Sequence, residues 1–128
     1  MITEELLTRF ESCTLADFHH ADHVHVAWAM LREAPLLEAL ARFSASLRRF
    51  AAAGGKPQLY HETITWAYMI VIHERMERAP VADWEEFARA NADLLTWKPS
   101  VLDRYYRPET LASDTARRIF VLPERPSS

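Results

Sequence analysis

The sequence has little cysteine and little glycine, and each shortage excludes a kind of site. Cys13 is the only cysteine among 128 residues. A single cysteine forms no internal disulfide bond, and it rules out zinc sites that need two or more thiolates. The only glycines, Gly54 and Gly55, are adjacent. Phosphate-binding loops need several glycines at fixed spacing, so a nucleotide-binding loop of that type is excluded as well.

Long apolar runs and an excess of positive charge are also absent. The longest apolar run, 66–72, has seven residues, far fewer than the roughly 20 of a membrane-spanning helix. Residues 1–11 lack the basic and apolar regions of a signal peptide. The formal net charge is −3, opposite in sign to that of typical nucleic-acid binders. We therefore predict a cytoplasmic protein, as one unpaired thiol also suggests, with neither a nucleic-acid nor a membrane partner.

The spacing of apolar residues predicts helices along most of the chain. The clearest helix begins at Pro35 and ends before Gly54, which we expect to be a left-handed cap. Its apolar residues recur at steps of three and four: Leu36, Leu40, Phe43, Leu47 and Phe50. Segment 60–79 contains a run that resembles a buried strand, but nearly twenty residues pass without Gly or Pro. We predict a helix there that is apolar nearly all round and therefore central.

The remaining segments complete an all-α fold. Helices are expected over residues 2–11, from about 18 to 33, from 84 to 92 after an Asp83 cap, and in short stretches at 99–106 and 113–120. We predict one compact domain over residues 1–128, with about four main helices and short C-terminal helices packed on them. Residues from about 121 to 128 are expected to form a loose tail. The apolar content, 49%, permits a homodimer without requiring one.

Four of the six histidines lie within residues 17–25. In a helix that begins near Phe18, His20 and His23 are three residues apart and share one face, on or beside the buried side. The positive end of the helix dipole disfavours imidazolium there, so both rings are expected to be neutral. His25 is expected to point toward the surface.

A second polar cluster opens the predicted central helix. His61 lies at its start, and Thr65 follows one turn later on the same face. Thr63 and Thr65 each cost about 0.5 kcal/mol of helix propensity relative to alanine. A hydroxyl bonded to a ligand or to a histidine would explain their presence, and so would packing of their β-branched side chains. We predict both threonines as substrate-binding residues.

The two clusters predict a shared site if their helices pack with their first turns together. His20, His23 and His61 would then form a triad of neutral imidazoles, which suits a divalent transition metal such as zinc, iron, copper or nickel. The same histidines would also serve a polar small-molecule pocket without metal, or simply cap helices. Whether the protein is an enzyme stays open, and no catalytic residue is assigned. A reaction would be metal-assisted or acid–base in type.

Two tryptophans are candidates for the wall of this pocket. Trp28 and Trp66 each lie five residues after a histidine of the predicted triad, although plain core packing also accounts for them. The alternative to a pocket is a non-enzymatic interaction module or accessory subunit whose histidines are structural. Four aromatic rings exposed together would favour that alternative: Trp84, Trp97, Tyr105 and Tyr106.

Several motifs together resemble those of a widespread family of small bacterial proteins of unknown function. The motifs are Phe-x-His-x-x-His with a following Ala-Trp (Phe18, His20, His23, Ala27, Trp28), aromatic-His-x-Thr-Ile-Thr (Tyr60, His61, Thr63, Ile64, Thr65), the stretch 104–113, and Val-x-Pro-Glu at 121–124. The resemblance covers nearly the whole chain. It implies no activity, but it selects the same three histidines and two threonines and leaves out His19 and His25.

Overall fold

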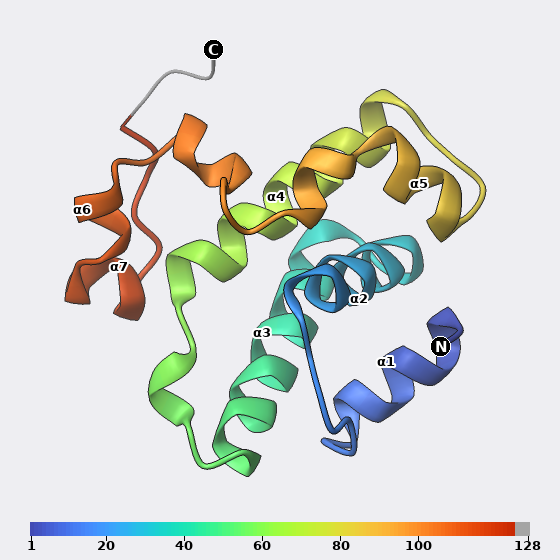
Figure 1. Cartoon of the computed structure of the whole chain (residues 1–128), viewed down its shortest axis with the longest axis horizontal. Coiled ribbons are helices and arrows are strands. Elements are labelled where there is room, and N and C mark those ends of the chain that lie inside the picture. Colours follow the sequence, from blue (N-terminus) through green and yellow to red (C-terminus); the bar gives the residue numbers. More distant parts are fainter. Residues whose placement is uncertain (125–128) are drawn as a thin grey trace.

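The computed structural model describes residues 1–124 and confirms the all-α fold (Figure 1). Within that range there is no strand. The α-helices are α1 (Thr3–Glu11), α2 (His20–Glu33), α3 (Leu36–Ala53), α4 (Glu62–Arg78), α5 (Trp84–Ala90), α6 (Pro108–Leu111) and α7 (Asp114–Arg118). Short 3-10 helices are η1 (Pro57–Leu59), η2 (Ala92–Leu95) and η3 (Val101–Arg104). None of the helices in the described part has the length and apolarity to cross a membrane.

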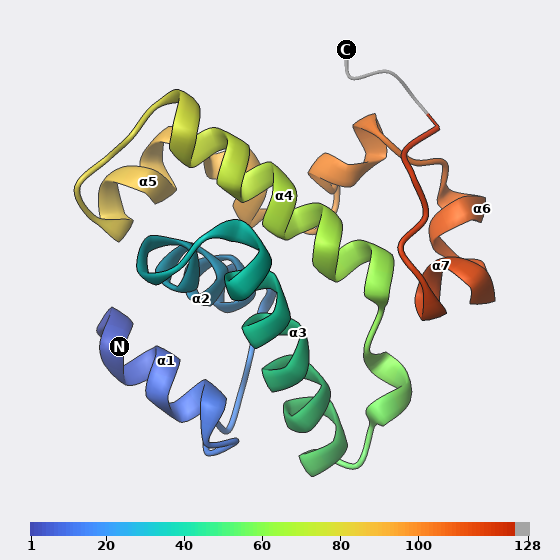
Figure 2. The same ribbon diagram turned by 180° about the vertical axis from the view of Figure 1, so that it is seen from behind.

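Helix α4 is the central element, as its composition predicts. Helices α2 and α3 pack on α4 and on each other, and α1 packs against α2 and α3. The C-terminal helices α6 and α7 lie beside the first turn of α4, whereas α5 lies near its other end (Figures 1 and 2). Because neighbours surround α4, residues on several of its sides are buried, including Thr63, Met69 and Ile72.

The boundary after α3 differs in detail from the sequence prediction. Gly54 is the C-cap, but its φ is −82° and therefore not left-handed. Gly55 carries the positive φ, +75°, which glycine adopts without a steric penalty because it has no Cβ. The chain then turns through η1 toward α4. The left-handed residue was thus predicted one position too early.

The prediction of a loose C-terminal tail is wrong for residues 121–124. The Tyr106 hydroxyl donates to the Val121 carbonyl at 2.7 Å, and the Val121 N–H donates to Thr63 Oγ1 at 3.0 Å. The Glu124 N–H donates to the Tyr105 carbonyl at 3.2 Å. The sequence of this segment has no helical periodicity, which is why we expected a loose tail. Long-range hydrogen bonds, which leave no periodic signal in the sequence, hold it in place. The rest of the predicted tail, 125–128, lies outside the described residues.

Candidate functional site

A cavity of about 450 Å³ lies where α2, α3 and α4 meet. Its wall comes from α2 (His20, His23, Val24, Ala27), α3 (Phe43, Leu47), η1 (Leu59), α4 (His61, Ile64, Thr65, Tyr68, Met69, Ile72), Trp97 and Arg117. The volume falls within the range of small-molecule sites, which are concave and mostly apolar with a few polar groups. All three histidines singled out in the sequence line this cavity. The structure therefore brings the first turns of α2 and α4 to one site.

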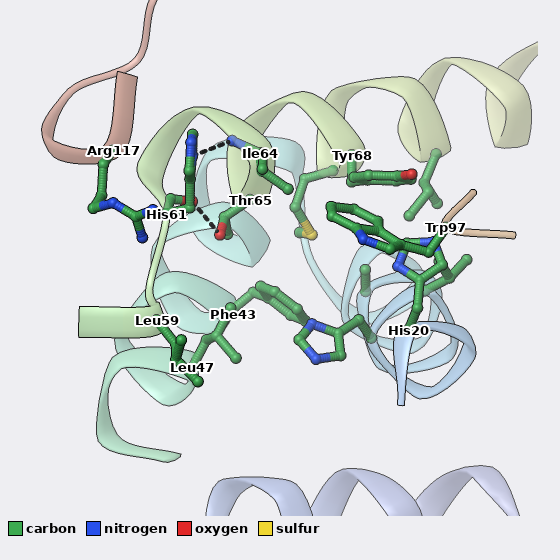
Figure 3. A pocket seen from close by; sticks show the side chains of 15 residues that line it. His20, Phe43, Leu47, Leu59, His61, Ile64, Thr65, Tyr68, Trp97 and Arg117 are labelled. Atoms are coloured by element: carbon green, nitrogen blue, oxygen red, sulfur yellow. Dashed lines mark hydrogen bonds between the residues drawn. The ribbon is translucent and has the colours of Figure 1, made fainter. Parts of the chain in front are cut away.

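The polar and aromatic groups lie at two ends of the cavity (Figure 3). At one end are His61, Thr65 and Arg117, and at the other are His20, Tyr68 and Trp97. Apolar side chains, among them Phe43, fill the wall between them. A bound molecule would therefore contact polar atoms at its ends and carbon along its middle.

His61 is held by hydrogen bonds at both ring nitrogens. Its Nδ1 accepts from the Ile64 N–H at 3.1 Å, which makes His61 the N-cap of α4. Its Nε2 lies 2.7 Å from the Leu111 carbonyl. A carbonyl only accepts, so Nε2 carries the proton and the ring is a neutral tautomer. Burial is the main cause that lowers the pKa of His61. His61 thus has no ring lone pair left for a ligand or a metal.

His20 keeps one ring nitrogen for the cavity. Its Nε2 donates to the Leu94 carbonyl at 2.9 Å, so the Nδ1 lone pair of the neutral ring stays available. The ring lies edge-on to Tyr68, with centroids 4.9 Å apart, and 5.3 Å from the ring of Trp97. Burial lowers the pKa of His20. His20 is therefore a neutral acceptor set between two aromatic rings.

Among the three histidines that line the cavity, His23 is the one whose ring has no hydrogen-bond partner in the described part of the chain. Its ring stacks on Phe18 with centroids 4.0 Å apart and lies 6.4 Å from the ring of Phe43. Burial, with a smaller contribution from neighbouring His20, lowers the pKa of His23 to about 4. At neutral pH the ring is therefore uncharged and offers the cavity one N–H donor and one lone pair.

The metal site predicted from the sequence does not fit these contacts. Within residues 1–124, no group of three or more His, Cys, Asp and Glu side chains is placed to hold a metal ion. His61 uses both ring nitrogens in structural hydrogen bonds. The predicted set of His20, His23 and His61 therefore lacks a third lone pair for zinc, iron, copper or nickel.

The two threonines of the sequence motif have different roles. Thr65 lines the cavity, and its hydroxyl donates to the His61 carbonyl one turn earlier at 2.7 Å. Thr63 is completely buried and lies away from the cavity. It donates to the Ile119 carbonyl at 2.8 Å and accepts from the Val121 N–H at 3.0 Å. Thr63 was thus wrongly predicted to bind substrate, because it anchors the C-terminal segment to α4.

Neither tryptophan predicted to wall the pocket does so. Trp28 is 2% exposed and packs against Trp84 and Phe87, with centroids 5.7 and 6.2 Å apart. Trp66 stacks on Phe120 at 5.3 Å. Both rings point to other parts of the core, since five residues along a helix turn a side chain by about 140°. Trp97, which was not selected for the pocket, lines it instead.

The surface position expected for His25 is also wrong. Its side chain is 8% exposed and stacks on Trp84, with centroids 4.1 Å apart. Its Nε2 lies 2.8 Å from Thr3 Oγ1. Because α1 and α5 both cover this side of α2, a face that appears polar in the sequence is buried. His25 joins these elements and takes no part in the cavity.

Sequence reasoning also missed the three other wall residues whose side chains carry hydrogen-bonding groups, Tyr68, Trp97 and Arg117. Tyr68 lies in the helix that was correctly predicted, two turns after His61. Trp97 and Arg117 come from irregular or short segments, and no periodic signal places such residues. Only the packing of the C-terminal half against α2 and α4 brings them to the cavity.

Comparison with known protein families, curated proteins and solved structures found no match to this chain. The resemblance to the bacterial family of unknown function therefore stays a prediction. The interpretation of the site depends on its own geometry.

Proposed function

We propose that the protein binds a small, mainly apolar molecule in the cavity between α2, α3 and α4, and that His23 forms a hydrogen bond with it. The observation that carries this proposal is the contrast among the histidines. His25 and His61 have specific partners, whereas the ring nitrogens of His23 have none in the described residues. Because the His23 ring lines the cavity, its N–H donor and its lone pair are open to a molecule bound there. A ligand in the cavity would supply that partner.

The pKa of His23 favours binding over catalysis. An acid–base catalyst works best with a pKa near the operating pH. The pKa of His23 is lowered to about 4, so its ring is a weak base at pH 7. Its neutral N–H and lone pair still recognise hydroxyl, carbonyl or amide groups. We therefore propose a binding site and assign no reaction.

The alternative of an aromatic interaction surface has no support in the geometry. Tyr106 is 1% exposed and bonded to the Val121 carbonyl. Trp84 stacks on His25, whereas Trp97 lies at the cavity over His20. The four rings therefore do not form one exposed patch, and a cavity is the better candidate for recognition.

The neutral fluorescent probe N-phenyl-1-naphthylamine tests the proposal. We expect one probe to bind per chain with increased emission. Ala27→Leu adds carbon to the cavity wall and is expected to weaken binding by about tenfold or more. The same change should keep or raise the midpoint of thermal unfolding, because it fills empty space. Ala45→Leu makes the matched change at an exposed position on α3 and should leave binding unaltered.

Two outcomes would count against the cavity. Failure of the probe to bind, with the chain folded by circular dichroism, would contradict the proposal. Equal loss of binding in Ala27→Leu and Ala45→Leu would show that the probe binds elsewhere.

A further inference from the structure

Among residues 1–124, Arg117 is the one charged side chain that lines the cavity, and no Asp or Glu of that range does. One N–H of its guanidinium donates to the Gln58 carbonyl at 2.9 Å, which holds the side chain near η1. Within residues 1–124 no carboxylate pairs with it. A guanidinium has five N–H donors, so four remain for other acceptors. Figure 3 shows Arg117 at the same end as His61 and Thr65.

The rest of this end cannot neutralise the charge. His61 is a neutral cap whose Nε2–H already donates to Leu111, and the charge of Arg117 is one of the causes that lower its pKa. The Thr65 hydroxyl donates within α4. The other two histidines of the cavity, His20 and His23, are neutral as well, since their pKa values are lowered. The cavity therefore presents a single positive charge beside an apolar wall.

We propose that the ligand of this cavity is a carboxylate with an apolar body, whose carboxylate pairs with Arg117. This inference rests on the proposed binding function. A guanidinium and a carboxylate match in shape and form two parallel hydrogen bonds. One guanidinium neutralises one negative charge, which favours a singly charged carboxylate. The apolar body lies along Phe43 and Ile64, and the aromatic rings of Tyr68 and Trp97 favour a flat end.

Three probes with one ring system and different end groups test this assignment. They are 1-naphthylacetate, 2-(1-naphthyl)ethanol and 2-(1-naphthyl)ethylamine, measured by isothermal titration calorimetry at pH 7.5 and low salt. We expect the carboxylate to bind about tenfold more tightly than the alcohol, and the amine to bind most weakly.

The variant Arg117→Gln is expected to weaken carboxylate binding by about tenfold and to change alcohol binding by less than twofold. Arg118→Gln is the matched control, because Arg118 is adjacent, exposed, and paired with Asp114 at 2.9 Å. It should leave all three affinities unchanged. Both arginines are exposed, so both variants should fold, and circular dichroism verifies this.

The outcomes separate this inference from the binding function. If the alcohol binds as tightly as the carboxylate, or if Arg117→Gln keeps the preference, the carboxylate assignment is overturned and the cavity remains a binding site. If none of the three probes binds at millimolar concentration but N-phenyl-1-naphthylamine does, the carboxylate assignment alone is overturned; if that probe does not bind either, both proposals fail.

Discussion

Hydrogen-bond partners, more than residue type, separate the histidines of this protein into structural and recognition groups. His61 satisfies both ring nitrogens, and His25 bonds to Thr3 across two helices. The His23 ring stacks on Phe18 and lies beside the tilted ring of Phe43, and neither ring accepts a hydrogen bond from it. The same side chain thus supports a helix terminus in one place and faces a cavity in another.

The buried neutral state of His23 predicts a pH-dependent stability. Its pKa is lowered from 6.5 to about 4 in the folded protein, so the unfolded chain binds the proton more readily. The stability is therefore fully present above pH 6.5 and declines as the pH falls toward 4. Each pH unit between the two pKa values corresponds to about 1.4 kcal/mol, which gives a loss of about 3 kcal/mol by pH 4.

His23→Phe removes this titration and keeps a ring stacked on Phe18. Urea unfolding at pH 7 and pH 4 should show that the wild-type protein loses about 3 kcal/mol more than the variant over this interval. Other groups that titrate there affect both proteins alike. Parallel stability curves would contradict the assignment of a buried neutral His23.

The sequence was sufficient to place three histidines at one cavity, but it did not reveal their chemistry. Helical spacing selects the faces of His20 and His23, and a helix start selects His61. However, His20 donates to the Leu94 carbonyl, 74 residues away along the chain, and His61 donates to the Leu111 carbonyl, 50 residues away. No local pattern encodes such partners. The sequence could not show that His61 uses both ring nitrogens in structural hydrogen bonds, so it predicted a metal site that these contacts do not fit.

The first turn of α4 begins with a buried polar residue, His61. The N-cap of α4 is a histidine, where serine, threonine, aspartate and asparagine are the preferred residues. His61 also donates a hydrogen bond to the carbonyl of Leu111, the last residue of α6. One ring therefore accepts from a backbone N–H that has no partner within the helix, and it also attaches α6 to the start of α4.

Substitutions at His61 are expected to separate these two roles. His61→Ala removes the cap and the bond to Leu111 and should lower the free energy of unfolding by about 1 to 3 kcal/mol. His61→Asn restores an acceptor for the Ile64 N–H and should recover about 1 kcal/mol of that loss. Chemical denaturation at pH 7.5 measures both.

His73 offers a matched control on the same helix. Its ring is half-buried and 3.9 Å from the exposed Glu77 carboxylate, so His73→Ala should change stability by less than about 0.5 kcal/mol. Equal destabilisation by His61→Ala and His61→Asn would indicate that the cap contributes little.

Most of the elements could be predicted from the sequence, because apolar periodicity and punctuation by proline and glycine are local signals. The helices from Thr3 to Arg78 begin and end close to their predicted limits. Residues 99–106 form only the short η3, and α6 was not foreseen. These segments have no apolar stripe at helical spacing in their own sequence, so their conformation depends on the contacts they make with the rest of the fold.

At the scale of the whole molecule, the segment 119–124 is tied to the first turn of α4, and we call this segment the strap. Thr63 fixes the strap between Ile119 and Val121, and Tyr106 fixes it again at Val121. Helix α7 lies just before these contacts and carries Arg117. The anchoring of the strap therefore determines where the positive charge meets the cavity.

Thr63→Val keeps the shape of the side chain and removes both hydrogen bonds. We expect a loss of about 1 to 3 kcal/mol, since the Val121 N–H and the Ile119 carbonyl lose their partner. Hydrogen exchange followed by mass spectrometry should show faster exchange in 119–121, with α1 to α3 unaffected.

Thr110→Val serves as the comparison for this prediction, because the Thr110 hydroxyl donates to the Glu124 carboxylate near the surface. Its effect on exchange at 119–121 should be small. Unchanged exchange in Thr63→Val would mean that the strap is held mainly by other contacts.

The wall of the cavity is drawn from residues 20 to 117, and this has a consequence for the life of the chain. A chain that ends before residue 117 lacks part of the wall, so affinity for an occupant arises only when synthesis and folding of the described chain are nearly complete. An occupant at a hundred times its dissociation constant would add about 2.7 kcal/mol to the free energy of unfolding. Supply of the small molecule would then set how long each copy of the protein resists degradation.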